Sequence, residues 1–236
     1  MSSEEVFVNV LLMFLCYVYI LFIIFVSSKM DKPLHISKKT SRKFLHMMIG
    51  NFPFIIPFFT SDICPVLVAA PFILVTFFTS PHSPFKNIGK RLKGLADITE
   101  EGHHLGLVFY AVSYTFLALF FASKPCVIAA GILPMAYGDS AASIVGERYG
   151  RRRYKLVAAK SFEGSAAMFF ASFVSFAVSL FFFSTLYSFS VFGKIFPALA
   201  VAAVATLVES FSPLGFDNLT VPAFSALTFL LLDGGI

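Results

Sequence analysis

Long apolar stretches separated by short polar ones recur along the whole chain. They cover residues 6–26, 44–59, 65–79, 105–122, 126–145, 161–186, 195–208 and 219–232. About 20 apolar residues in a helix span the ~30 Å hydrocarbon core of a bilayer. The pattern therefore predicts an all-α fold, a polytopic bundle of seven or eight transmembrane helices, in which the weak seventh stretch leaves the number open. Several helices should be short or bent, because proline stands at positions 53, 57, 65, 71 and 134.

The composition also indicates a membrane protein. Of the 236 residues, 58% are hydrophobic and only 13% are charged, whereas a soluble domain carries about 25% charged residues. We expect one integral membrane domain over residues 1–236. The net charge of +5 does not favour nucleic acid as a partner, because the basic residues lie in short loops between apolar stretches. The first apolar stretch is too long for a cleavable signal peptide.

The charges in the loops predict how the helices are oriented. Loops 27–43, 80–104 and 146–160 hold 16 of the 18 lysine and arginine residues, and only Lys124 and Lys194 fall elsewhere. Short loops rich in lysine and arginine stay in the cytoplasm. With eight helices, these three loops are expected to be cytoplasmic and both termini external.

Asp139 is an acid inside the fifth apolar stretch. A lone carboxylate at such a depth costs roughly 2.5–3.5 kcal/mol on insertion scales. Asp139 should therefore face the bundle interior and meet a metal ion, a cation or water, with Gly138 allowing close backbone approach and Ser143 nearby. The alternative is a structural hydrogen bond between helices along a small, serine-rich face.

Basic residues follow this helix. They are Arg151, Arg152 and Arg153, and Lys160, Ser161 and Glu163 come next, at the start of the sixth stretch. The arginines could contact anionic lipid headgroups or bind phosphate. Lys160 places a positive charge near a helix N-terminus, whose free N–H groups also favour an anion. Glu163 either complements the helix dipole beside a Ser161 cap or has a metal-binding or acid–base role.

Oxygen-bearing side chains gather at the last predicted cytoplasmic connection, which has no lysine or arginine. They are Glu209, Asp217, Asn218 and Thr220. Asp217 or Asn218 could simply cap the eighth helix. Alternatively, they are ligands of Mg²⁺, which takes one or two carboxylates together with substrate phosphates. Glu101, just before the fourth stretch, is a weaker candidate.

Arg42, Lys43 and His46 stand at the start of the second stretch. Arg42 and His46 are four residues apart and share one face of a helix. They could snorkel to the membrane interface, or they could clamp a phosphate with a histidine nearby as donor or base.

These motifs occur in an order that resembles one family. The series is RKFLH at 42–46, EG at 101–102, GDSAAS at 138–143, GERYG at 146–150, KSFEGS at 160–165 and DNLTVP at 217–222. It resembles the polyprenol kinases, which include dolichol kinase, phytol kinase and microbial relatives that act on shorter isoprenoid alcohols. The resemblance covers about residues 41–232 and leaves the first helix and loop, residues 1–40, outside it.

The resemblance implies a membrane enzyme that transfers the γ-phosphoryl group of CTP, with Mg²⁺ or another divalent cation, to an isoprenoid alcohol at the cytoplasmic face. The alcohol would be of the phytol, geranylgeraniol, farnesol or dolichol type. Phosphates would lie near Gly138, Ser161, Lys160, Arg42, Lys43 and one or more of Arg151, Arg152 and Arg153. The metal ion would lie near Asp139, Glu163, Asp217 and Asn218, with Asp139 as an alternative base, and His46 and Glu163 would also act in catalysis.

Two other functions remain open at this point. The central GD and KSFEGS motifs are also similar to CDP-diacylglycerol synthases, which use CTP to attach CMP to a lipid phosphate. Those enzymes characteristically carry a Pro-Gly-His-Gly-Gly element where this chain has DNLTVP. A transporter or channel with Asp139 in its pathway is the third function, but the polar groups gather on one face and no internal repeat is visible. The oligomeric state is not predicted.

Overall fold

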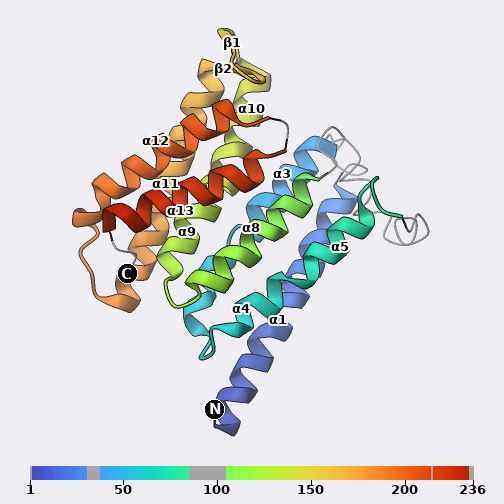
Figure 1. Ribbon diagram of the computed structural model, residues 1–236, viewed down its shortest axis with the longest axis vertical. Helices are drawn as coiled ribbons and strands as arrows, with labels where there is room; N and C mark the ends of the chain where they lie inside the picture. The colour runs from blue at the N-terminus through green and yellow to red at the C-terminus, as the bar shows by residue number, and fades with distance from the viewer. Residues whose placement is uncertain (1, 31–37, 85–104, 214, 234–236) are drawn as a thin grey trace.

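The computed structural model describes residues 2–30, 38–84, 105–213 and 215–233, and these are almost entirely helical (Figure 1). The longer helices are α1 (Ser3–Lys29), α3 (Lys38–Ile49), α4 (Ile63–Ala69), α5 (Pro71–Thr79), α8 (Gly106–Phe121), α9 (Pro125–Leu133), α10 (Asp139–Tyr149), α11 (Phe162–Tyr187), α12 (Ile195–Phe211) and α13 (Asp217–Asp233). Two short strands, β1 (Arg153–Lys155) and β2 (Ala159–Ser161), complete the fold. The predicted all-α, membrane-type fold is confirmed.

Four helical segments of the described chain are long and apolar enough to cross a bilayer. They are Ser3–Lys29, Pro125–Tyr149, Phe162–Tyr187 and Phe192–Phe211. Shorter apolar helices occur at Ile63–Thr79 and Gly106–Phe121, and α13 contains the last apolar stretch of the sequence. The number of seven or eight spans stays a prediction.

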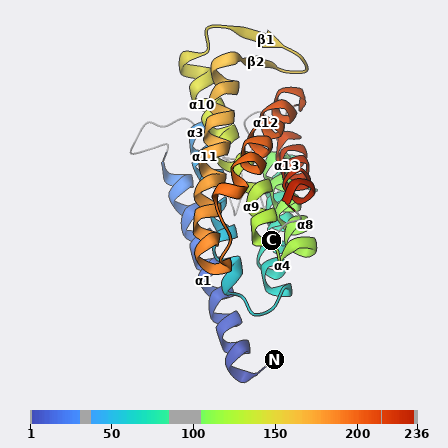
Figure 2. The same cartoon turned by 90° about the vertical axis from the view of Figure 1, so that its left-hand side faces the viewer.

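The bundle is built around α9, all nine residues of which are buried. In Figure 1, α1, α4 and α5 lie on one side of the molecule, and α11, α12 and α13 lie on the other. Small residues allow close packing: a Cβ at Gly131 of α9 would lie 2.8 Å from the Pro222 carbonyl oxygen of α13. The amino-terminal end of α1 and the β1–β2 hairpin lie at opposite ends of the molecule (Figure 2).

The second apolar stretch, 44–59, is interrupted, as its prolines predict, and only its first part is an α-helix. Helix α3 ends at Ile49 and is followed by the 3₁₀ turns Phe52–Phe54 and Ile56–Phe58. Pro53 and Pro57 remove backbone donors that a continuing helix would use. Gly50 lies so close to the next helix that a Cβ there would be 2.4 Å from the Ala136 side chain.

Side chains form hydrogen bonds to the backbone carbonyl groups that are left free where α3 ends inside the bundle. The last carbonyls of a helix have no partner within it, and lipid offers them none. The Tyr110 hydroxyl donates to the His46 carbonyl at 3.0 Å, and the Tyr19 hydroxyl donates to the Met48 carbonyl at 2.7 Å. Asn51 Nδ2 donates to the same Met48 carbonyl at 3.2 Å. These bonds hold the end of α3 in place.

The fifth apolar stretch is one helical segment with a wide turn in it. Helices α9 and α10 are joined by a π turn at Pro134–Gly138, and Asp139 follows at once. Pro134 lacks the N–H of a regular helix, and π turns occur often at functional sites. The segment also runs past its predicted end at 145, to Tyr149. The third stretch, predicted over 65–79 with an interruption at Pro71, is divided into α4 and α5 at that proline.

The segment after α10, predicted as a loop, forms an antiparallel hairpin. Arg153 pairs with Ser161, Tyr154 with Lys160 and Lys155 with Ala159. The Tyr154 hydroxyl lies 2.5 Å from Ser165 Oγ of α11 and 2.8 Å from Ser210 Oγ of α12. The hairpin is thereby fixed to both helices, and its second strand places Lys160.

Candidate functional site

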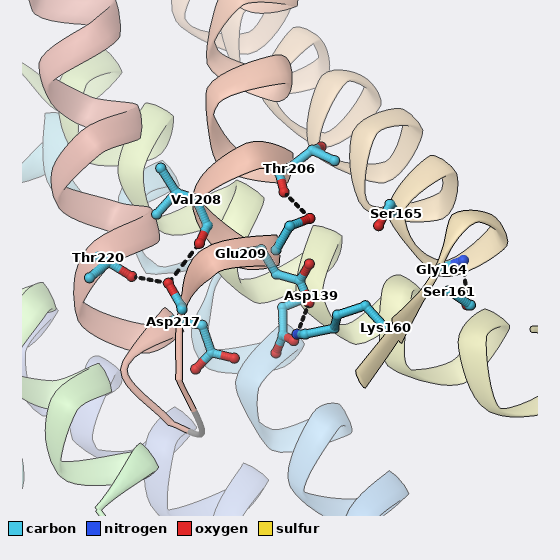
Figure 3. Close-up of polar contacts among 12 residues, drawn as sticks. Asp139, Lys160, Ser161, Gly164, Ser165, Thr206, Val208, Glu209, Asp217 and Thr220 are labelled. Carbon is cyan, nitrogen blue, oxygen red and sulfur yellow. Dashed lines mark hydrogen bonds and ion pairs between the residues drawn. The ribbon is translucent and has the colours of Figure 1, made fainter. Parts of the chain in front are cut away.

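A polar cavity of about 280 Å³ lies at the end of the bundle that carries the hairpin. Helices α3 and α10, the hairpin, and the ends of α11, α12 and α13 that face it supply its walls. Its charged lining residues are Lys39, Arg42, Lys43, Asp139, Glu147, Arg153, Lys160, Glu209 and Asp217. Figure 3 shows Asp139, Lys160, Glu209 and Asp217 turned toward one another from four different elements.

Asp139 forms an ion pair with Lys43 in the floor of this cavity. The two side chains are 10% and 8% exposed, so water does little to screen the pair. Ser140 Oγ donates to the Lys43 carbonyl at 3.4 Å and adds a second contact between α10 and α3. Asp139 thus faces the bundle interior, as predicted, and the cation that it meets is the ammonium group of Lys43.

Lys160 and Glu209 form a second ion pair, between β2 and α12 (Figure 3). The Glu209 side chain is 3% exposed and that of Lys160 is 23% exposed. Burial alone would lower the pKa of Lys160, but the Glu209 carboxylate, with Asp139 and Asp217 farther away, raises it above its ordinary value. Lys160 therefore remains an ammonium ion that a phosphate can attract.

The first turn of α13 contributes Asp217 and Asn218. Asp217 Oδ1 accepts the backbone N–H of Asn218 at 2.9 Å, and the Asn218 carbonyl accepts the Ser113 hydroxyl at 2.6 Å. Asn218 is buried, yet its side-chain oxygen Oδ1 has no hydrogen-bond partner in the described parts of the chain. A buried acceptor without a partner is costly. Both residues line the cavity, so a small rotation of the Asn218 side chain would be needed to bring this oxygen to a ligand there.

Helix α3 presents one continuous face to the cavity. Lys39, Arg42, Lys43 and His46 all line it, at the spacing of three and four residues that puts side chains on one helical face. Arg42 and His46 are buried, and the His46 ring lies 4.6 Å from the Tyr110 ring, centroid to centroid. The structure therefore brings all three predicted residues of this motif to the site.

Two charged lining residues were not among the predicted site residues. Lys39 pairs with Glu147 of α10 across the mouth of the cavity. The spacing of Lys39 from Lys43 would have indicated its place on the α3 face. Glu147 lies two turns after Asp139 on the same helix, at a spacing that also keeps it near that face.

Several predicted residues lie elsewhere. Arg151, Arg152 and Glu163 fall outside the cavity lining, whereas Arg153, Ser143 and Ser161 belong to it. Glu163 accepts the backbone N–H of Arg152 at 3.3 Å, a contact that holds the hairpin against α11. Ser161 caps α11 by accepting the Gly164 N–H at 3.0 Å.

The remaining candidates have packing contacts or lie outside the described ranges. A Cβ at Gly138 would lie 2.2 Å from Ser172 Oγ, so this glycine allows α11 to pack against the π turn. Thr220 Oγ1 lies 2.6 Å from Ser212 Oγ and links α13 to the end of α12. Glu101 lies outside the described residues.

The oxygen atoms of the cavity suit a hard divalent cation held partly by phosphate. Asp139, Glu209, Asp217 and Asn218 supply carboxylate and amide oxygens, the donors that Mg²⁺ prefers. Within the described ranges, no three histidine, cysteine or acidic side chains form a complete metal cluster.

Known proteins are similar to this chain over most of its length. It is 42% identical to the phytol kinase of Synechocystis sp. over 141 residues, 58% of this chain and 59% of that protein. It is 31% identical to the dolichol kinase of Saccharomyces cerevisiae over 198 residues, 80% of this chain and 36% of that protein. It is 30% identical to a probable chloroplastic phytol kinase of Triticum aestivum over 219 residues, 84% of this chain and 69% of that protein.

The fold and the cavity define a helical membrane protein with a charged site suited to phosphate at one end of the bundle. The comparisons place the chain more narrowly: it belongs to the polyprenol kinase family, with the phytol and dolichol kinases. The chain spans 59% and 36% of the lengths of the first two relatives named above. No protein-family model and no solved structure matches it.

Proposed function

We propose that this protein phosphorylates an isoprenoid alcohol of the membrane, with CTP as donor and Mg²⁺ as the divalent cation. The alcohol is of the phytol, geranylgeraniol, farnesol or dolichol type, the class to which the named relatives point. The observation that carries the proposal is the convergence of Lys43 and Lys160, each paired with a buried carboxylate, in one cavity. Phosphoryl transfer depends mainly on positioning and charge neutralisation.

The lysines are the proposed phosphate ligands. The carboxylates keep Lys43 and Lys160 inside the cavity. A short rotation would bring either ammonium group to a phosphate oxygen there. Arg42 and Arg153 line the same space and can bind phosphate in a bidentate manner. The lining holds five lysine and arginine residues against four acids, so it is close to neutral. A triphosphate therefore needs its own cation to balance its charge.

The proposed cation ligands are Glu209, Asp217 and Asn218. A bound Mg²⁺ would neutralise charge that builds up on the phosphates during transfer. Glu163 has no part in this set, because its carboxylate contacts the hairpin backbone outside the cavity. The buried Asn218 Oδ1 gains the partner that the described protein residues do not give it.

Asp139 is the proposed base. Its ion pair with Lys43 holds the carboxylate beside the proposed phosphate ligands, where the alcohol must approach. Asp139 then accepts the proton of the alcohol, the alcohol oxygen bonds to the γ-phosphorus, and the bond from that phosphorus to the departing CDP breaks. His46, buried beside Lys43 on α3, lies where it can contact the transferred phosphoryl group.

The cavity is proposed to face the cytoplasm, in a bundle of seven or eight spans. The charge distribution of the loops supports this orientation. A cysteine at Leu156, exposed near the tip of the hairpin, should react with a membrane-impermeant thiol reagent in inside-out vesicles and stay protected in intact cells. Labelling in intact cells would show that the orientation is reversed.

The activity is tested with purified protein, γ-labelled CTP or ATP, Mg²⁺ and a set of isoprenoid alcohols. Label should appear on the lipid, with CTP the better donor. Asp139→Asn should lower kcat by about 10²–10⁴-fold, the usual range for a lost general base. Lys160→Met should raise the KM for CTP, and Lys155→Met, on the same hairpin but outside the cavity lining, should leave it unchanged. Absence of label from every alcohol, or release of pyrophosphate with a lipid phosphate as acceptor, would contradict the proposal.

A further inference from the structure

A second cavity, of about 60 Å³, lies among α1, α3, α4, α5 and α8. In Figure 1 these helices make up the side of the bundle away from α11, α12 and α13. Its lining includes Leu45, Ile49, Phe72, Leu107, Ala111 and Tyr114. This cavity plays no part in the phosphate and metal chemistry described above.

The walls of this cavity are apolar. Thr76 is in the lining, but its hydroxyl donates to the Phe72 carbonyl at 2.6 Å. Tyr110 is also in the lining, and its hydroxyl donates to the His46 carbonyl at 3.0 Å. Apolar cavities of small size stay dry and bind apolar groups. The Tyr114 hydroxyl, the third polar group of the lining, is buried and has no hydrogen-bond partner among the described residues. The surface that faces the cavity is apolar and suits a hydrocarbon segment.

The apolar cavity adjoins the polar one. On α3, Lys43 and His46 line the polar cavity, while Leu45 and Ile49 line the apolar one. On α8, Gly106 lines the first and Leu107 the second. A helix rises 1.5 Å per residue, so the two linings overlap along the axes of α3 and α8 to within about one helical turn, on neighbouring faces of these helices.

The rings of His46 and Tyr110 mark the boundary between the two cavities. His46 lines only the polar cavity and Tyr110 only the apolar one, and their centroids are 4.6 Å apart. A molecule with a hydroxyl at one end and a branched hydrocarbon next to it matches this change of polarity.

We propose that the apolar cavity binds the isoprene unit next to the hydroxyl of the acceptor alcohol. This inference rests on the proposed function, because it assigns the position of that substrate. An engineered apolar cavity of about 150 Å³ holds one benzene ring, so a cavity of about 60 Å³ encloses only part of a five-carbon isoprene unit, such as its methyl branch, while the rest of the unit lies along the lining. Ile24, Ile49 and Phe72 of the lining are partly exposed, and past them the rest of the tail continues into the bilayer.

A consequence is that the cavity recognises the head end of the alcohol and not its total length. Alcohols of different length but with the same first isoprene unit should bind with similar affinity. Bulk introduced into the cavity should weaken binding of all of them by a similar factor.

The first test uses fluorescence, because the chain contains no tryptophan. Phe72→Trp places a single tryptophan, which can be excited selectively, at the cavity, and Phe116→Trp places one on an exposed surface of α8, where Phe116 is 56% exposed. The probe is a farnesol analogue brominated on its first isoprene unit. Quenching should saturate at Phe72→Trp and rise only linearly with probe at Phe116→Trp. Linear quenching at both positions would show simple partitioning and overturn the inference.

The second test fills the cavity. Ala111→Phe adds a ring at a buried lining position, and Ala223→Phe adds the same ring at an exposed position of α13. Ala111→Phe should raise the KM for short and long alcohols alike by about tenfold or more, with CTP binding unchanged. Ala223→Phe should resemble the wild type. If Ala111→Phe does not fold, Ala111→Val is the milder substitution and should raise the KM in the same direction.

The outcomes separate the two proposals. Phosphorylation by the wild type, with unchanged KM in the Ala111 variants and no saturable quenching, would overturn the cavity assignment and leave the kinase activity standing. Saturable quenching at Phe72→Trp without phosphorylation of any alcohol would support the binding site and overturn the kinase activity.

Discussion

Breaking the Lys43–Asp139 pair should destabilise the protein far more than removing the pair as a whole. Lys43→Met leaves the Asp139 carboxylate buried, and Asp139→Asn leaves the Lys43 ammonium buried, because the side chains are only 8% and 10% exposed. Loss of one partner of a buried pair costs about 3–5 kcal/mol, whereas replacement of both by uncharged groups is often neutral. Other charges of the cavity partly compensate, so we expect about 3 kcal/mol for each single variant.

The double variant Lys43→Met/Asp139→Asn should recover most of that loss. Two independent losses of about 3 kcal/mol would add to about 6, so a double variant near the wild type means a coupling energy of about 5 kcal/mol between the two positions. A change of 1 kcal/mol shifts Tm by about 2–4 °C in a chain of this size. Each single variant should therefore melt roughly 6–12 °C below the wild type, and the double variant close to the wild type.

The measurement is thermal unfolding in detergent, followed by circular dichroism at one ionic strength. The Lys39–Glu147 pair is the matched control, because its side chains are 43% and 54% exposed and an exposed pair contributes about 0.2–1 kcal/mol. A coupling energy at Lys43 and Asp139 no larger than that of the control pair would refute the reasoning. All three variants should lose activity, whatever their stability.

Three further changes test other contacts. Glu209→Gln removes the carboxylate that holds Lys160 and should raise the Mg²⁺ concentration needed for half-maximal activity. An unchanged Mg²⁺ titration would contradict a ligand role for Glu209. Gly138→Ala forces a Cβ to 2.2 Å from Ser172 Oγ; it should cost about 1–3 kcal/mol in thermal unfolding, and Ser172→Ala should recover part of this. Glu163→Gln weakens the contact between α11 and the hairpin backbone; limited trypsin digestion should cut the hairpin faster, while CTP binding in the intact protein stays near that of the wild type.

The apolar pattern located the helices better than it located their ends. The sixth stretch, predicted over 161–186, is α11 over Phe162–Tyr187, because nothing in it interrupts a helix. In the second stretch, Pro53 and Pro57 predicted an interruption, but the pattern did not show that the chain continues there as two 3₁₀ turns. The hairpin was not predicted, since strands of three residues are too short to show an alternating pattern.

Most of the charged residues that line the cavity were candidates in the sequence, but their pairings were not predicted. Asp139 was expected to face inward, yet its partner Lys43 lies 96 positions away, and no spacing rule connects segments so distant. Glu209 was a weak candidate for the site in the sequence, because a single acid at the end of an apolar helix is common. Its importance comes from Lys160, which the hairpin brings to it. Pairing between distant segments is a property of the packed bundle.

The π turn at Pro134–Gly138 changes the direction in which the following side chains point around the helix axis. A π turn contains one residue more than an α turn, and one residue corresponds to about 100° of rotation at 3.6 residues per turn. Compared with an uninterrupted α-helix, the side chains of the cavity-facing α10 are therefore rotated by about that angle relative to those of the fully buried α9. Deleting a single residue within the turn would keep the chain just as apolar, but it would rotate Asp139 away from Lys43 and toward a neighbouring helix. The direction in which this carboxylate points is thus set by how many residues precede it in the turn.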